Sequence, residues 1–171
     1  SELPMYRRSK MGLGYLPQES SIFRGMNVEE NILAILQKSQ KPSIEKEKLL
    51  NKLLSDFGIE HIRQSPSLSL SGGERRRLEI ARCMALNPNF ILLDEPLAGI
   101  DPIAIQDVKN LIQNLKNKNI GVLITDHNVK STLEIVDRAY IIFEGKVLFE
   151  GKPNEIVNNK NVRTFYLGQN F

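Results

Sequence analysis

Three short apolar runs in this sequence are each followed by polar residues of kinds that carry chemistry. Two adjacent carboxylates after a buried strand suit a divalent cation beside a general base, since Mg²⁺ prefers carboxylate and water oxygens. Each polar group taken alone has a plainer interpretation, because acidic residues and histidines also occur in ordinary turns. The polar residues are Gln18, Asp94, Glu95, Asp126 and His127, which follow residues 13–16, 90–93 and 121–125.

A second candidate site is the segment Ser71-Gly72-Gly73-Glu74, which precedes a helical pattern. A hydroxyl and two unobstructed backbone donors at the positive end of a helix dipole can hold an anion. The spacing of Ser71 and Glu74 equally fits a capping box, and the two roles are compatible. Two glycines at a helix start cost about 1 kcal/mol each relative to alanine, which favours a backbone that another group approaches closely.

The elements that would position these residues form an α/β pattern. The three apolar runs are predicted to be strands of a parallel sheet, where ligands bind outside the carboxyl ends. Asp101 and Pro102 open a helix between the second and third strands, which completes a β-α-β unit. Helices are predicted from residue 27 with Asn27 as cap, over residues 49–57, and over residues 72–86.

The remaining segments are predicted from turn and capping residues. The first ten residues are expected to be irregular, and residues 37–48 to be a polar loop leading to a helix capped by Ser43. After His127, a helix is predicted at 129–136, strands at 139–143 and 146–149 around a Glu144-Gly145 turn, and a helical tail from Pro153 to near Gly168.

Composition limits the class of protein. The chain has 171 residues, 41% of them apolar and 25% charged, and 23 basic against 20 acidic residues leave a net charge of +3. These values indicate one globular domain and do not call for a nucleic acid partner. No apolar run approaches the ~20 residues of a membrane span, and no signal peptide is evident. Cys83 is the one cysteine, so an internal disulfide is excluded and a reducing, cytoplasmic setting is expected.

The ordered set of motifs resembles the nucleotide-binding subunits of ABC transporters. Residues 70–74 (LSGGE) resemble the family's signature, residues 90–95 (FILLDE) its Walker B strand with the catalytic glutamate, and residues 97–101 its D-loop. Gln18 resembles the Q-loop glutamine and His127 the switch histidine. All five stand in the family's order and span nearly the whole chain. The resemblance implies an α/β fold of the P-loop NTPase type.

The resemblance also implies the role of each residue. Asp94 and Gln18 would hold Mg²⁺, while Glu95, His127 and Gln18 would act in hydrolysis of ATP. The residues facing the nucleotide of the opposite copy in a homodimer would be Ser71, Gly72, Gly73, Glu74 and Asp101. By this interpretation residues 1–24 belong to the core, 25–88 form the helical subdomain with the signature, and 89–171 complete the core and tail.

Within the family, the stretches around Gln18 and His127 and the terminal residues 166–171 resemble the ATPases of lipopolysaccharide exporters. Two transmembrane subunits would dock coupling helices in a groove near Phe23 and Arg24, on the cytoplasmic face of the inner membrane. ATPases of branched-chain amino acid importers are the alternative. A nucleic acid ATPase with Arg75-Arg76-Arg77 as its basic patch is not favoured, since no wider basic stripe supports it.

One departure from the family is that the phosphate-binding loop G-x-x-x-x-G-K-[ST] occurs nowhere in these residues. We therefore expect an N-terminally truncated chain that binds ATP poorly by itself. We also expect the truncation to expose apolar faces around Leu92 and Ile124. The alternative is a non-catalytic partner that lends its signature to an intact copy.

Overall fold

The computed structural model describes residues 2–167 and divides the chain into two compact units. The first runs to Asp126 and the second begins at His127. Each unit is described by itself. The boundaries predicted after residues 24 and 88 remain a prediction.

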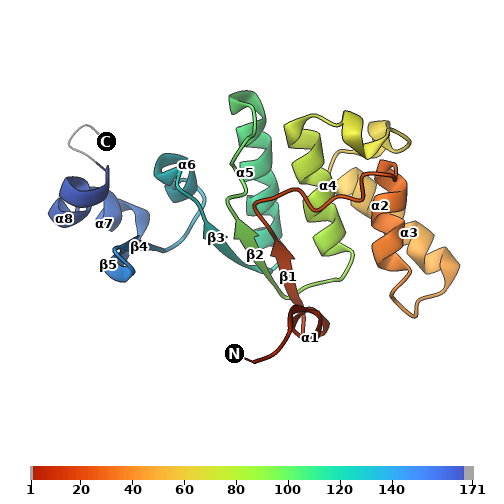
Figure 1. Cartoon of the computed structure of the whole chain (residues 1–171), viewed down its shortest axis with the longest axis horizontal. Helices are drawn as coiled ribbons and strands as arrows, with labels where there is room; N and C mark the ends of the chain where they lie inside the picture. The colour runs from red at the N-terminus through yellow and green to blue at the C-terminus, as the bar shows by residue number, and fades with distance from the viewer. Residues whose placement is uncertain (1, 168–171) are drawn as a thin grey trace. The chain divides into compact units, whose positions relative to one another are not determined.

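The first unit contains a three-stranded parallel sheet (Figure 1). Its strands β1 (Leu13–Leu16), β2 (Phe90–Asp94) and β3 (Gly121–Thr125) stand in the order β1-β2-β3. Their register places Tyr15 beside Leu92 and Leu92 beside Leu123. All three predicted parallel strands are confirmed, and β2 extends one residue further than expected, to Asp94.

The helices α4 (Gly72–Met84) and α5 (Pro102–Asn117) connect successive strands of this sheet. The order of the strands across the sheet is the same as their order along the chain. Right-handed crossover connections then place both helices on the same face of the sheet. Leu16, Ile91 and Leu93 are accordingly buried, whereas Tyr15 and Leu123, which alternate to the opposite face, are 43% and 50% exposed.

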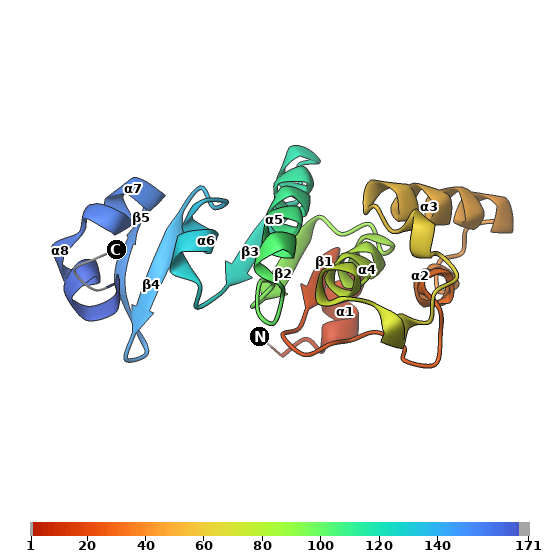
Figure 2. The same ribbon diagram turned by 90° about the horizontal axis from the view of Figure 1, so that it is seen from above.

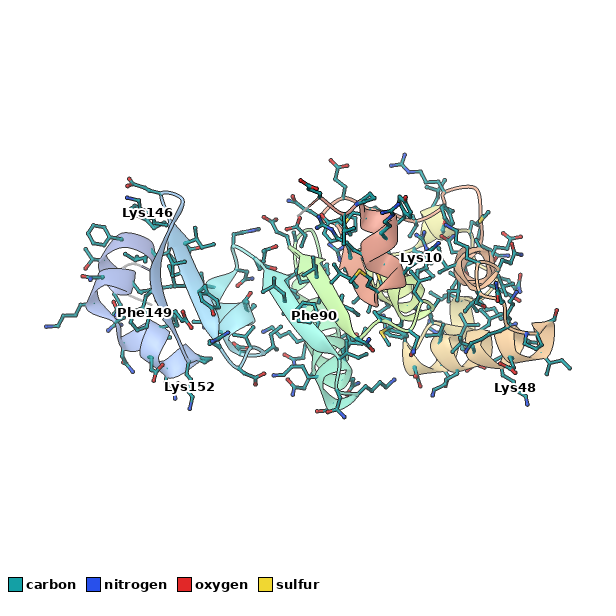
Figure 3. All side chains as sticks on the ribbon, turned by 90° about the horizontal axis from the view of Figure 1, so that it is seen from below. Lys10, Lys48, Phe90, Lys146, Phe149 and Lys152 are labelled. Atoms are coloured by element: carbon teal, nitrogen blue, oxygen red, sulfur yellow. The ribbon has the colours of Figure 1, made fainter. Side chains whose placement is uncertain are left out.

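Phe90, labelled in Figure 3, shares the open face of the sheet and is 40% exposed. Leu92 and Ile124, around which exposed apolar faces were expected, are only partly exposed. Ile124 alternates to the helix-covered face, so its neighbour Leu123 is the more exposed residue.

Helix α4 also packs against a group of helices formed within residues 25–88, and lies between them and the sheet (Figure 2). These elements are α2 (Val28–Leu36), α3 (Ser43–Asp56) and the 3₁₀ turns η1 (Glu60–Ile62) and η2 (Ser67–Ser69). Asn27 and Glu30 form the predicted capping box at the start of α2. The buried side chains of Ile32, Leu36, Leu50 and Leu54 form its core.

Two local predictions were wrong. The first residues are not irregular throughout, because α1 spans Met5–Lys10 behind Pro4, whose carbonyl accepts from Arg7 N. Ser43 is not a cap but the first residue of α3. Pro42 is the N-cap and bonds through its carbonyl to the N–H groups of Glu45 and Lys46, so part of the lysine-rich segment is helical.

The second unit is an antiparallel hairpin covered by short helices. Its elements are α6 (Val129–Leu133), β4 (Ala139–Phe143), β5 (Lys146–Gly151), α7 (Pro153–Asn158), α8 (Lys160–Val162) and the π-helical turn η3 (Arg163–Leu167). Positive φ at Glu144 and Gly145 closes the predicted turn. The core contains Leu133, Ile141, Ile156 and Val162.

Helix α6 ends at Leu133, three residues before the predicted end, where the N–H of Ile135 donates to the carbonyl of Thr132 in a tighter turn. The predicted end of the tail at Gly168 and the last four residues of the terminal stretch lie outside the described residues. Within residues 2–167, no helix is both long enough and apolar enough to span a bilayer.

Candidate functional site

The carboxyl edge of the sheet brings together three of the predicted site residues. Gln18 Nε2 donates a hydrogen bond of 2.8 Å to Glu95 Oε2 across 77 positions of sequence. Asp94, the last residue of β2, accepts a 2.6 Å bond from Thr125 Oγ1 and a 3.4 Å bond from Tyr15 OH. The edge therefore presents two adjacent carboxylates and an amide, the polar groups that follow the apolar runs in the sequence.

Glu95 occupies an uncommon backbone conformation. Its φ of +44° lies in the left-handed region, which costs non-glycine residues free energy and persists where the surroundings fix it. Glu95 N donates to the carbonyl of Thr125 at 2.8 Å, and Glu95 O accepts from Ala98 N at 3.1 Å. These bonds hold a sharp turn directly after the strand, where Glu95 meets Gln18.

A buried ion pair lies behind this edge. Arg76 and Glu79, on α4, are separated by 3.1 Å, with side chains only 6% and 2% exposed. Arg76 donates to the carbonyls of Pro17 and Glu95, at 3.3 and 3.2 Å. Glu79 Oε1 accepts from Ser20 Oγ at 2.8 Å and from the N–H of Ser21 at 3.0 Å. The pair therefore contacts both the loop that carries Gln18 and the turn at Glu95.

Burial shifts the pKa of two groups near this edge. Desolvation, with the charge of Asp94 as a second cause, raises the pKa of Tyr15 above its ordinary value of 10.0. Desolvation also raises the pKa of the Cys83 thiol to about 11, and Cys83 Sγ donates to the carbonyl of Tyr15.

The segment before α4 is a capping box, as one of the two interpretations predicted. The N–H of Glu74 donates to Ser71 Oγ at 3.3 Å, and Glu74 Oε2 accepts from the N–H of Ser71 at 2.8 Å. The bond from the Ser71 side chain is the main cause that lowers the pKa of Glu74. Ser71 and Gly72 are nevertheless exposed, so the start of α4 presents donors to solvent.

The two glycines of this segment are approached closely by the chain itself. A Cβ added at Gly73 would lie 2.9 Å from Ala104 Cβ, and one at Gly72 would lie 3.2 Å from the carbonyl of Gly99. Asp101 caps α5 by accepting from the N–H of Ile103 at 2.8 Å. The signature-like segment therefore packs against the loop after β2 and the start of α5.

Phe23 and Arg24 are both exposed and lie in a loop whose backbone is held by hydrogen bonds from buried side chains. The fully buried Asn31 accepts from the N–H of Phe23 and donates to its carbonyl, and Ser67 Oγ donates to the same carbonyl. The guanidinium of Arg82 lies 4.3 Å from the centre of the Phe23 ring. The loop thus presents an aromatic ring and a cation at the surface of the first unit.

His127 is exposed and is the first residue of the second unit. Its carbonyl accepts from the N–H of Val129 at 3.0 Å, at the start of α6. Its place beside Gln18 and Glu95 remains a prediction.

Known proteins resemble the chain over almost its whole length. The family described as ABC transporter matches residues 2–98. An uncharacterized ABC transporter ATP-binding protein of Rhizobium meliloti is 57% identical over 99% of the chain and 63% of its own length. A probable ABC transporter ATP-binding protein of Azorhizobium caulinodans is 56% identical over 99% of the chain and 60% of its own length. The chain belongs to the ABC transporter family.

Further relatives of this ABC transporter chain include the lipopolysaccharide export system ATP-binding protein LptB of Escherichia coli. It is 51% identical over 100% of the chain and 71% of its own length. A solved ATP-binding cassette of an ABC transporter in its ADP conformation has a TM-score of 0.80 and 25% identity, covering 95% of the chain and 71% of that protein. The cbiO1 protein of Clostridium perfringens has a TM-score of 0.82 and 26% identity, covering 97% of the chain and 66% of that protein. The predicted α/β ATPase fold is confirmed, and the chain spans about three fifths of the first two relatives.

The assignment of the signature, Walker B and Q-loop motifs to individual residues stays a prediction, while the side chains at the sheet edge have the chemistry that binding of Mg²⁺ requires. Within residues 2–167, no group of three or more His, Cys, Asp or Glu side chains forms a metal cage. Mg²⁺ requires none, since one or two carboxylates together with substrate phosphates hold it. The half-buried carboxylate of Asp94 and the amide oxygen of Gln18 are hard oxygen donors of the kind that Mg²⁺ takes.

Sequence reasoning missed Tyr15, Thr125 and the Arg76–Glu79 pair in this ABC ATPase domain. The run Arg75-Arg76-Arg77 suggested a basic patch for nucleic acid, an alternative that was not favoured, and Arg76 is in fact 5% exposed and donates to two carbonyls. The available signal was the three-residue spacing of Arg76 and Glu79, which places opposite charges on one helix face. Nothing in the sequence connects Tyr15 or Thr125 to Asp94, because the contact depends on strand order.

Proposed function

We propose that this chain is part of the ATP-hydrolysing subunit of an ABC transporter, and that the transporter exports lipopolysaccharide. The observation that carries the ATPase proposal is the 2.8 Å bond between Gln18 and Glu95, beside Asp94 at the carboxyl edge of the sheet. The cargo proposal is supported by 51% identity to LptB over the whole chain.

Each residue at the edge has a role that its chemistry allows. Bound Mg²⁺-ATP would supply the phosphoanhydride bond to be cleaved, and its cation would stabilise negative charge on the phosphate oxygens. Asp94 and Gln18 would hold the cation through oxygen atoms. Glu95 would orient the attacking water and accept its proton, and the bond from Gln18 would fix the carboxylate for that task. His127 would donate to the phosphate that is transferred.

A second copy would complete the site. Ser71 caps a helix of 13 residues that starts at Gly72, so Ser71, the N–H groups of Gly72 and Gly73 and the positive end of the helix dipole would face a phosphate on the opposite copy. Glu74 would hold Ser71 in place through the capping box, and Asp101 would lie at the same interface. Closure of the homodimer would exclude water from the reacting groups.

The loop at Phe23 and Arg24 would receive coupling helices from two transmembrane subunits at the cytoplasmic face of the inner membrane. Its exposed aromatic ring and cation are residue types enriched in protein interfaces, and Asn31 and Ser67 hold the loop rigid. A Phe23→Ala variant should co-purify with less of the membrane subunits while its ATP binding is unchanged.

The substitution Glu95→Gln tests the ATPase proposal in the intact protein. It keeps a hydrogen-bonding side chain but removes the base, so ATP should bind and turnover should fall by about 10²–10⁴. Glu45→Gln, an exposed residue of α3, is the control for loss of one carboxylate. Undiminished turnover in Glu95→Gln would remove Glu95 from the mechanism.

The cargo is tested by depleting the protein in its own cells. Accumulation of lipopolysaccharide at the inner membrane, with unchanged uptake of branched-chain amino acids, is the expected result. The reverse pattern would assign the chain to an importer and leave the ATPase proposal intact.

A further inference from the structure

The carboxylate of Asp94 is held from both sides by hydroxyl groups of the neighbouring strands. Thr125, opposite Asp94 in the register of β2 and β3, donates to Oδ1 at 2.6 Å. Tyr15 of β1 lies on the same face of the sheet and donates to Oδ2 at 3.4 Å. Each carboxylate oxygen therefore has one neutral donor.

We propose that Thr125 and Tyr15 are positioning residues that set the orientation of Asp94 toward Mg²⁺. This proposal rests on the proposed function, in which Asp94 holds the cation. Neutral hydroxyl donors fix the plane of a carboxylate without cancelling its charge, whereas lysine or arginine would compete with the cation. A carboxylate has about four lone-pair sites, so each oxygen of Asp94 keeps capacity for a metal.

The coordination geometry of Mg²⁺ explains why the orientation of the Asp94 carboxylate matters. Mg²⁺ requires near-octahedral geometry, so a carboxylate that rotates freely binds it less well. Outer-shell partners of metal ligands typically change metal affinity by about 10–100-fold. Because its hydrogen bond to Asp94 is the shorter, Thr125 should contribute more than Tyr15 to the orientation of the carboxylate.

The two hydroxyls are not needed to pair the strands. The backbone ladders already join β2 to β1 and to β3, and both side chains are exposed at the sheet edge. Replacing either hydroxyl removes a contact with Asp94 and leaves the buried face of the sheet unchanged. A change in metal affinity can therefore be separated from a loss of fold.

The test uses the intact protein and measures binding of a non-hydrolysable ATP analogue at stepped Mg²⁺ concentrations. The readout is the Mg²⁺ concentration at half-maximal binding. Thr125→Val should raise it by about tenfold, and Tyr15→Phe should raise it less. Thr125→Ser, which keeps the hydroxyl, should restore the value of the unmodified protein. Tyr140→Phe, on an exposed tyrosine of β4, is the matched control.

Asp94→Asn separates this inference from the proposed function. If Asp94→Asn weakens Mg²⁺-dependent binding and Thr125→Val and Tyr15→Phe do not, the positioning role is overturned and the metal role of Asp94 stands. If Asp94→Asn has no effect, both are overturned. If Thr125→Val misfolds, Tyr15→Phe and Thr125→Ser decide the question. A higher Mg²⁺ concentration at half-maximal binding in Tyr15→Phe, with no change in Thr125→Ser, supports the proposal. Any other pattern refutes it.

Discussion

Arg76 donates a 3.1 Å hydrogen bond to Glu79 while both side chains are almost completely shielded from water. Arg76 also reaches the carbonyls of Pro17 and Glu95, and Glu79 holds Ser20 and Ser21. One buried pair on α4 therefore ties the Gln18 loop to the turn that carries Glu95.

Removing one member of this pair should destabilise the protein strongly. Arg76→Met leaves the charge of Glu79 buried without its partner, which typically costs about 3–5 kcal/mol of unfolding free energy. The matched control is Arg138→Met, because Arg138 and Glu150 are also 3.1 Å apart but are 62% and 46% exposed. That exposed pair should contribute about 0–1 kcal/mol.

Denaturant unfolding of both variants gives the comparison. A double variant, Arg76→Met with Glu79→Leu, should recover much of the lost stability because no buried charge remains. Equal costs for Arg76→Met and Arg138→Met would contradict the assignment of a buried pair.

Gly73→Ala should destabilise the protein through a steric clash. The added methyl would lie 2.9 Å from Ala104 Cβ, which forces α4 and α5 apart at a cost of about 1–3 kcal/mol. Gly25→Ala is the control, since a Cβ there meets nothing within 4 Å. Thermal unfolding of the two variants should separate them, and equal melting temperatures would exclude the close packing at Gly73.

Glu29 should contribute to the pH dependence of stability. Its bidentate bonds from Arg63, at 2.6 and 2.9 Å, are the main cause that lowers its pKa from the ordinary value of 4.5. Because the folded pKa is the lower one, the contribution is complete above pH 4.5 and is lost as pH falls through the folded value.

Glu29→Gln should therefore lose about 1 kcal/mol of stability at pH 7 and show less dependence on pH below 4.5. Urea unfolding between pH 3 and 7 measures both effects, with Glu45→Gln as a control for the lost charge. A pH profile parallel to that of the unmodified protein would disprove this role.

Cys83 should react slowly with thiol reagents. Burial raises its pKa to about 11, so the reactive thiolate is scarce at pH 8. Labelling by iodoacetamide should be far slower in the native protein than in urea. Equal rates would show that the thiol is not shielded.

The sequence determined which segments become strands and which polar residues end them. Continuous apolar runs at 90–93 and 121–125, and the capping spacing of Ser71 and Glu74, depend on neighbours a few residues away. Local rules therefore predicted β2, β3 and α4 correctly, and the order of the motifs along the chain indicated the ABC transporter family.

Local rules failed where an equally local alternative competed. Ser43 is a residue type favoured at helix caps, but Pro42 holds the N-cap position and its carbonyl accepts from the N–H groups of Glu45 and Lys46 in the first turn of α3. The start of the chain lacked periodicity, yet one turn of helix formed at Met5–Lys10.

Only the tertiary structure decided which distant groups meet. Gln18 and Glu95 lie 77 positions apart, and Asp94 and Thr125 lie 31 apart, so no local spacing predicts either contact. The order of the strands and their parallel direction place these residues at one edge of the sheet. The same packing buries Arg76, although it stands in a run of three arginines, because α4 lies between the sheet and the other helices.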